Sequence, residues 1–131
     1  MEMVGMGQSE LEDLAAEELE KEGRYVAPES NPGAGFYFRS DHFSFAKKGV
    51  PALYMGTGID HEEKGKDFGK ELAENYVAQY YHKPSDEYDP ERWNLEGAEQ
   101  DIGIYYRVGR RLAFSDRWPA WKEGSEFKAL R

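Results

Sequence analysis

The stretch from residue 95 to residue 113 constrains the fold of this chain more than any other. Its apolar residues recur at alternating steps of three and four residues, which is the spacing of one face of an α-helix. They are Leu95, Ala98, Ile102, Tyr105, Gly109 and Leu112. The spacing predicts one long amphipathic helix, and such a helix needs an apolar surface to cover. We expect that surface to be a face of a β-sheet.

A second helix is predicted near the start of the chain. Ser9 is followed three residues later by Glu12, which is the pattern of a capping box, and Gly23 is well placed to end the helix. The apolar stripe of this helix consists of Leu11, Leu14, Ala15 and Leu19. Short strands are expected around residue 4, over residues 25–27 and over residues 50–55.

These elements favour an α/β fold in which helices flank a small sheet of about three strands, with a long helix toward the C-terminal end. We expect residues 1–131 to form a single domain. Residues 71–79 are predicted to be helical, with Leu72, Tyr76 and Val77 facing inward, and residues 60–70 to be a solvated loop. The aromatic stretch over residues 118–127 is expected to pack back across the domain.

Composition excludes several classes of function. The formal net charge is -9, and no cluster of Lys and Arg reverses it, so nucleic acid is not an expected partner. No run of apolar residues reaches the roughly 18 that a membrane-spanning helix needs, so no membrane partner is expected. The chain has no cysteine, which leaves His, Asp and Glu side chains as the only candidate protein ligands for a metal.

The first candidate site, which we call the first block, covers residues 40–54. It begins with Ser40, Asp41 and His42, continues through a short helix that Gly49 ends, and closes with an apolar strand. Three adjacent residues rarely point at one another as the members of a hydrolase triad must. Ser40 or Asp41 is instead predicted to cap the short helix.

The second candidate site, the second block, covers residues 81–86. His82 is preceded by Tyr81 and followed four residues later by Asp86. From this spacing alone, His82 is a metal ligand with partners nearby, a general base, or a histidine of an ordinary loop. The remaining histidine, His61, lies in a charged run that predicts a solvated loop.

Taken in order, the two blocks resemble the C-terminal part of the zinc-dependent aminopeptidases of metallopeptidase family twenty-eight, whose relatives include glutamate carboxypeptidase and the glutaminyl cyclases. The resemblance extends over nearly the whole chain and implies a partial zinc-exopeptidase-like fold. The residues that carry it are Ser40, Asp41, His42, Phe45, Gly49, Val50, Pro51, Tyr54, Tyr81, His82, Pro84 and Asp86.

The resemblance also implies a role for each site residue. His82 corresponds to the last ligand of a site that holds two zinc ions in the complete family. Tyr81, Ser40 and His42 would shape the pocket, Asp41 would join its hydrogen-bond network, and Asp86 would hold the loop or orient the imidazole. In the family reaction, the metals polarise the carbonyl of an N-terminal peptide bond of the peptide substrate and activate a water, from which a glutamate removes a proton.

The family takes its other ligands and its catalytic glutamate from sequence upstream of the segment that this chain resembles. The paired glutamates at residues 17–18 and 62–63 do not follow the family's context, so neither pair is expected to replace that glutamate. A catalytic zinc site generally needs three protein ligands. We therefore expect the chain to be inactive alone and not to retain zinc by itself.

Two other accounts remain open at this stage. In the first account, the chain is a non-catalytic module that binds peptides or a partner protein in an aromatic pocket around Phe36, Tyr37, Tyr81 and Trp93. Alternatively, a metal site forms across a dimer from His82, His42 or His61 and carboxylates. A sheet of so few strands leaves an edge or an apolar face uncovered, so we expect a homo-oligomer.

Overall fold

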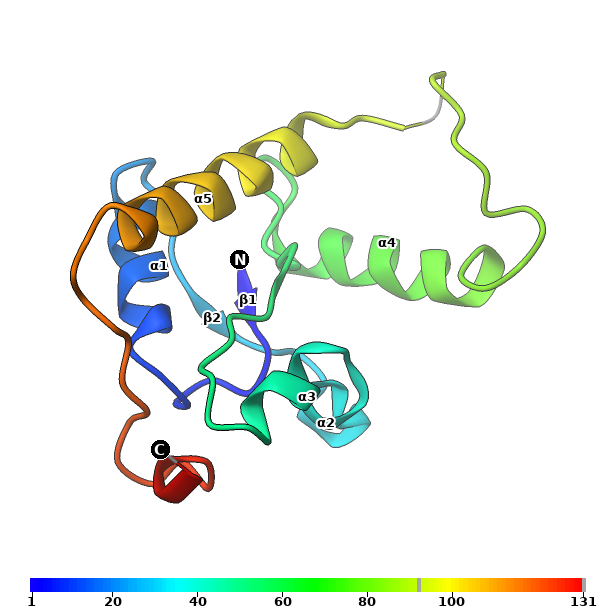
Figure 1. Cartoon of the computed structure of the whole chain (residues 1–131). Coiled ribbons are helices and arrows are strands. Elements are labelled where there is room, and N and C mark those ends of the chain that lie inside the picture. The colour runs from blue at the N-terminus through cyan, green and yellow to red at the C-terminus, as the bar shows by residue number, and fades with distance from the viewer. Residues whose placement is uncertain (92, 131) are drawn as a thin grey trace.

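The computed structural model describes residues 1–91 and 93–130. Within these residues, three strands and five α-helices follow one another (Figure 1), with single 3-10 turns at Pro32–Ala34 and Lys128–Leu130. In chain order, the strands and α-helices are β1 (Glu2–Met3), α1 (Leu11–Glu20), β2 (Ala27–Pro28), α2 (Phe36–Arg39), α3 (His42–Ala46), β3 (Met55–Gly56), α4 (Gly65–Gln79) and α5 (Glu96–Ala113).

The three strands form one mixed sheet in the order β2-β1-β3, which confirms the predicted small sheet between helices. The central strand β1 pairs in parallel with β2 and antiparallel with β3. Each strand is only two residues long, so most of the predicted strand over residues 50–55 lies outside the sheet.

Helix α1 begins close to where the capping box predicts, but the box forms only in part. Glu10 occupies the N-cap position without a side-chain capping bond, and the hydroxyl of Ser9 accepts from the N–H of Leu11 at 3.4 Å rather than from that of Glu12. The carboxylate of Glu12 accepts hydrogen bonds from the backbone N–H groups of Gly7, Gln8 and Ser9, at 2.8, 2.6 and 3.2 Å. Past the end of the helix, Gly23 has a φ of 71°, and the next N–H donates back to the carbonyl of Leu19. The Glu12 carboxylate therefore holds the turn that leads into the helix, and the contact past Gly23 satisfies a carbonyl that the helix leaves free at its C-terminal end.

Helix α5 covers the sheet together with α1, as predicted. The core that they share consists of Met1, Met3, Leu11, Leu14, Ala15, Leu19, Met55, Ile104 and Val108. The predicted face of α5 was only partly right, because Leu112 packs against this core but most of the other predicted residues do not. Ile104 and Val108 are buried, whereas Ile102, which we expected to face the sheet, is 67% exposed. Tyr105 lies at the edge of the contact, and its hydroxyl bonds the backbone of Met55.

Helix α4 also differs from its prediction. It begins at Gly65 rather than at residue 71, so part of the expected solvated loop is helical. None of its side chains is buried, and Leu72 and Val77 are 56% and 60% exposed. Figure 1 shows why, because α4 and the segment that follows it extend away from α1, α2 and α3. The inward face expected for α4 has no described element to pack against.

The C-terminal segment packs back across the molecule, as predicted. Trp121 and Phe127 are 5% and 3% exposed and form a second apolar cluster with Val4, Tyr37 and Ala46. The indole N–H of Trp121 donates to the carbonyl of Gly49 at 3.1 Å. None of the described helices combines the length and the apolar character that crossing a membrane requires.

Candidate functional site

The first block begins in the turn between α2 and α3. Asp41 occupies the N-cap position of α3, but its side chain is exposed and makes no capping hydrogen bond. The hydroxyl of Ser40 donates to the carbonyl of Phe36 at 3.0 Å and so belongs to the end of α2. The predicted capping role was therefore wrong for both residues, and the Asp41 carboxylate is left facing solvent.

His42 is packed among aromatic rings. Its imidazole lies 4.6 Å from the ring of Tyr37 and 5.1 Å from the ring of Tyr54, measured between centroids. Its Nε2 atom is buried and has no hydrogen-bond partner within the described part of the chain. Burial lowers the pKa of His42 below its ordinary value, so the ring is neutral near pH 7. His42 is therefore packed against aromatic rings at the start of α3, and its Nε2 atom does not face solvent as a metal ligand in an open site would.

His82 lies just beyond the end of α4, and its backbone is unusual. It has a φ of 59°, and among the described residues no other residue apart from glycine has a positive φ. This conformation is uncommon for a residue with a side chain and costs of order 1 kcal/mol, and such outliers cluster at functional sites. The side chain is exposed, and its ring meets the edge of Tyr81 at 4.1 Å. The turn therefore holds an accessible imidazole at a defined position.

Asp86 ties this turn back to α4. Its carboxylate accepts a hydrogen bond from the hydroxyl of Tyr76 at 2.8 Å, and its N–H donates to the carbonyl of Lys83 at 3.0 Å. The bond to Asp86 raises the pKa of the Tyr76 hydroxyl. Of the two roles that the resemblance allows for Asp86, these contacts correspond to holding the loop.

The two blocks are not brought together. The end of α4 and the segment after it project away from α2 and α3 in Figure 1. Within residues 1–91 and 93–130, no group of three or more His, Asp or Glu side chains could hold a metal ion.

The other candidate groups have structural contacts. The Nδ1 atom of His61 accepts from the backbone N–H groups of Glu63 and Lys64, where the chain enters α4. Glu18, one of the paired glutamates, is 3% exposed, and its carboxylate pairs with Lys21, Arg107 and Arg111.

The aromatic pocket considered above does not assemble in the described structure. Tyr37 is 4% exposed, and its ring packs on Phe127, whereas Tyr81 is half exposed at the end of α4. Trp93 packs on Tyr88 at 6.0 Å. No ring contact between described residues joins Tyr37 to Tyr81 or to Trp93.

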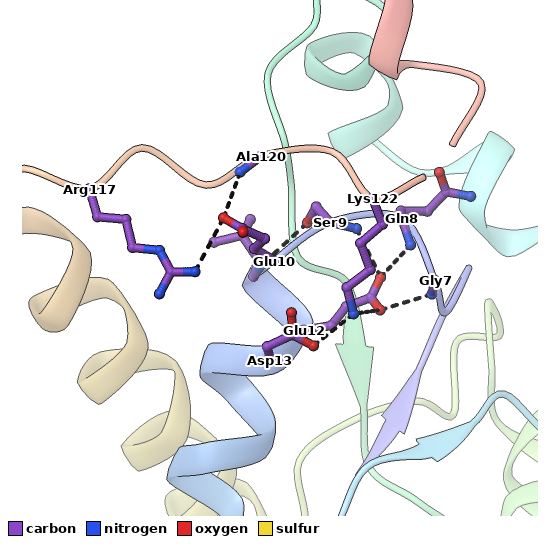
Figure 2. Close-up of polar contacts among 10 residues, drawn as sticks. Gly7, Gln8, Ser9, Glu10, Glu12, Asp13, Arg117, Ala120 and Lys122 are labelled. Carbon is purple, nitrogen blue, oxygen red and sulfur yellow. Dashed lines mark hydrogen bonds and ion pairs between the residues drawn. The ribbon is translucent and has the colours of Figure 1, made fainter. Parts of the chain in front are cut away.

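Sequence patterns did not reveal the polar junction between α1 and the C-terminal segment. Figure 2 shows Lys122 beside the carboxylates of Glu12 and Asp13, at 3.4 and 2.7 Å, and Glu10 between Arg117 and the N–H of Ala120. Such pairing of residues more than a hundred positions apart has no periodic signal. A shallow depression beside it is lined by residues of the C-terminal segment and by none of either block.

The model of a family described as peptidase family M28 matches residues 1–106, which include both blocks, all three strands and the first part of α5. No curated protein and no solved structure matches the chain significantly.

Proposed function

Because the chain belongs to peptidase family M28, whose model matches 106 of its 131 residues, we propose that it is a C-terminal segment of a zinc aminopeptidase domain. In this proposal the segment supplies the last metal ligand, His82, and part of the substrate pocket. The family is one of metallopeptidases, so the segment is peptidase-derived at that level. Cleavage of N-terminal peptide bonds is the specific activity that we propose for the assembled domain.

The backbone of His82 is the observation that supports this proposal best. A left-handed conformation holds an exposed imidazole just beyond the end of a helix. Gly or Asn adopts this backbone conformation at lower cost than His. A loop without a function for the imidazole would therefore gain stability from Gly or Asn at this position. The hydrogen bond between Tyr76 and Asp86 then fixes the turn to α4.

The proposal also requires ligands from outside the described residues. One imidazole does not retain zinc, because a catalytic site generally needs three protein ligands. We propose that the missing ligands and the catalytic glutamate come from polypeptide that binds next to α4. The unburied face of α4, with Leu72 and Val77 exposed, offers an apolar surface for it. Ser40, Asp41 and His42 would then border the pocket, and this chain would be inactive alone.

Complementation tests this function. We expect the chain alone, given zinc, not to cleave an aminoacyl p-nitroanilide and to give no calorimetric signal of tight zinc binding. Adding the N-terminal part of an intact member of the family, which carries the other ligands, should restore both zinc uptake and cleavage. Cleavage by the chain alone would contradict the inactive form that we propose.

A pair of histidine variants gives the matched control. His82→Ala should abolish cleavage and zinc uptake in the complemented mixture, whereas His61→Ala should retain both, because the contacts of His61 are with residues near the start of α4. Circular dichroism of both variants checks that they fold. If His82→Ala kept the activity of the unchanged chain, His82 would not be the ligand.

A further inference from the structure

Helix α5 has a second apolar face that no described element covers. It lies opposite Ile104 and Val108, which face α1, and it begins with Ile102 and Tyr106, each 67% exposed. We call this face the outer stripe of α5. It consists of Ala98, Ile102, Tyr106, Gly109 and Ala113, spaced three or four residues apart and all exposed. A surface helix normally carries polar residues on the face opposite its buried stripe, so a second apolar stripe needs another explanation.

Two opposite charges flank the outer stripe on the same side. Glu99 and Arg110 are eleven residues apart, close to three full turns, so they lie above one another along the helix. Both are exposed, and no ion pair among the described residues involves either of them. The guanidinium group of Arg110 lies 5.6 Å from the centroid of the Phe114 ring, which leaves its charge open to a further partner. Arg107 and Arg111 behave differently, because they pair with glutamates of α1 and of the turn after it.

The distribution of charge along α5 shows what would fit the stripe. The first turn is acidic, with Glu96 and Glu99, and the last turn is basic, with Arg110 and Arg111. A copy of the same helix running in the opposite direction would place acidic turns beside basic turns at both ends. A parallel copy would place like charges together, which destabilises a contact.

We propose that the outer stripe of α5 binds the outer stripe of a second copy of this chain, antiparallel, across a two-fold axis near residue 104. Pairs related by such an axis are centred on the same position. Ile102 and Tyr106 are centred on residue 104, and Glu99 and Arg110 between residues 104 and 105. Ile102 therefore faces the partner's Tyr106, and Glu99 faces the partner's Arg110, each pair occurring twice in the dimer.

The sheet edges offer much less to a second copy. Each edge strand is two residues long, so pairing there would form very few backbone hydrogen bonds. Helix α5 is 18 residues long and exposes its outer stripe over nearly its whole length. One helix from each copy makes a small interface, and such interfaces give reversible association rather than a permanent dimer. The proposal does not depend on the peptidase function.

Charge reversal tests the pairing directly by sedimentation velocity across the micromolar range. We expect the unchanged chain to pass from monomer to dimer as its concentration rises. Glu99→Arg alone and Arg110→Glu alone should each weaken the dimer by about tenfold or more, because each places like charges together twice. An equal mixture of the two variants should recover dimers, because the arginine introduced in one variant then faces the glutamate introduced in the other.

The control is Glu71→Arg, which makes the same change of charge on the exposed surface of α4 and should leave the dissociation constant unchanged. A chain that stays monomeric at all concentrations would overturn the proposal. So would dimers that survive both single variants, which would place the interface elsewhere, or a mixture that associates no better than either variant alone. Loss of complemented cleavage leaves these results unaffected, so the two proposals fail separately.

Discussion

At the scale of single residues, Gly5 is a position where the fold leaves no room for a side chain. Its φ is 67°, and a Cβ atom there would overlap the ring of the buried Tyr37. Gly5→Ala therefore combines the cost of a left-handed backbone with that of displacing a ring of the second apolar cluster. We expect it to lower the free energy of unfolding by about 2 kcal/mol or more, measured by urea denaturation.

Gly23→Ala is the matched control for this prediction. Gly23 has a similar φ of 71°, but a Cβ atom there would meet nothing within 4 Å. Its cost should be that of the backbone alone, about 1 kcal/mol. Equal losses in the two variants would show that the contact between Gly5 and Tyr37 contributes nothing.

His42 should make stability fall in mild acid. Burial holds the pKa of folded His42 below the 6.5 of a free imidazole. As pH falls through about 6.5, the unfolded chain therefore binds a proton that the folded chain does not, and the free energy of unfolding decreases. His42→Phe keeps an aromatic ring between Tyr37 and Tyr54 and should flatten the dependence between pH 7 and pH 5.

Urea denaturation at several pH values measures this dependence. Tyr37 does not confuse the result, because burial raises its pKa to about 12, far above the range tested. If the unchanged chain and His42→Phe showed the same slope against pH, His42 would not titrate differently on folding.

At the scale of elements, the patterns that succeeded are those with a local physical cause. The capping box and the glycine after α1 satisfy backbone groups within a few residues, so the sequence shows them directly. Strand lengths were harder, because a strand ends where its partner ends. Over residues 50–55 the chain is apolar, yet β3 can pair only as far as the two residues of β1.

The faces of α4 and α5 could not be read from spacing. Helix α5 carries two apolar stripes, and only the tertiary contact with α1 decides that Ile104 and Val108 are buried. Helix α4 carries an apolar stripe with no described partner. The neighbours of the candidate site residues could not be read from the sequence for the same reason. Motifs singled out His82 and Asp86 as candidates, but the residues that would complete a metal site come from distant parts of a sequence, and no such group lies among the described residues.

One glycine fixes how α4 joins the body of the molecule. A Cβ atom on Gly69 would overlap the backbone carbonyl of Ile59, in the loop that leads from β3. Backbone atoms cannot move aside as the end of a side chain can. We expect Gly69→Ala to lower the free energy of unfolding by about 1–3 kcal/mol and to loosen the contact between His61 and Phe68.

The control for Gly69→Ala is Gly97→Ala in α5, where a Cβ atom would meet nothing within 4 Å. Alanine is the better helix former, so this variant should gain up to about 1 kcal/mol. Urea denaturation followed by circular dichroism compares the two. Equal gains would mean that α4 is not pinned at Ile59.

At the scale of the whole molecule, stability is concentrated on one side. The sheet, α1 and α5 share one core, and the C-terminal segment closes a second cluster over α2 and α3. Helix α4 buries no side chain and joins the rest near its first turns. This division follows from the apolar contacts, because a helix without a buried face gains little from tertiary packing.

Hydrogen exchange should therefore separate α4 from the other long helices. The backbone hydrogen bonds of α1 and α5 break only when the shared core opens. We therefore expect the amides of these helices to exchange with the free energy of global unfolding. Amides of α4 can open while that core stays intact, and an isolated helix of 15 residues is marginal in water. We expect them to exchange orders of magnitude faster, measured by mass spectrometry of peptic fragments. Equal protection of α1 and α4 would contradict this arrangement, whereas slowing of α4 alone on addition of a complementing N-terminal part would show where that part binds.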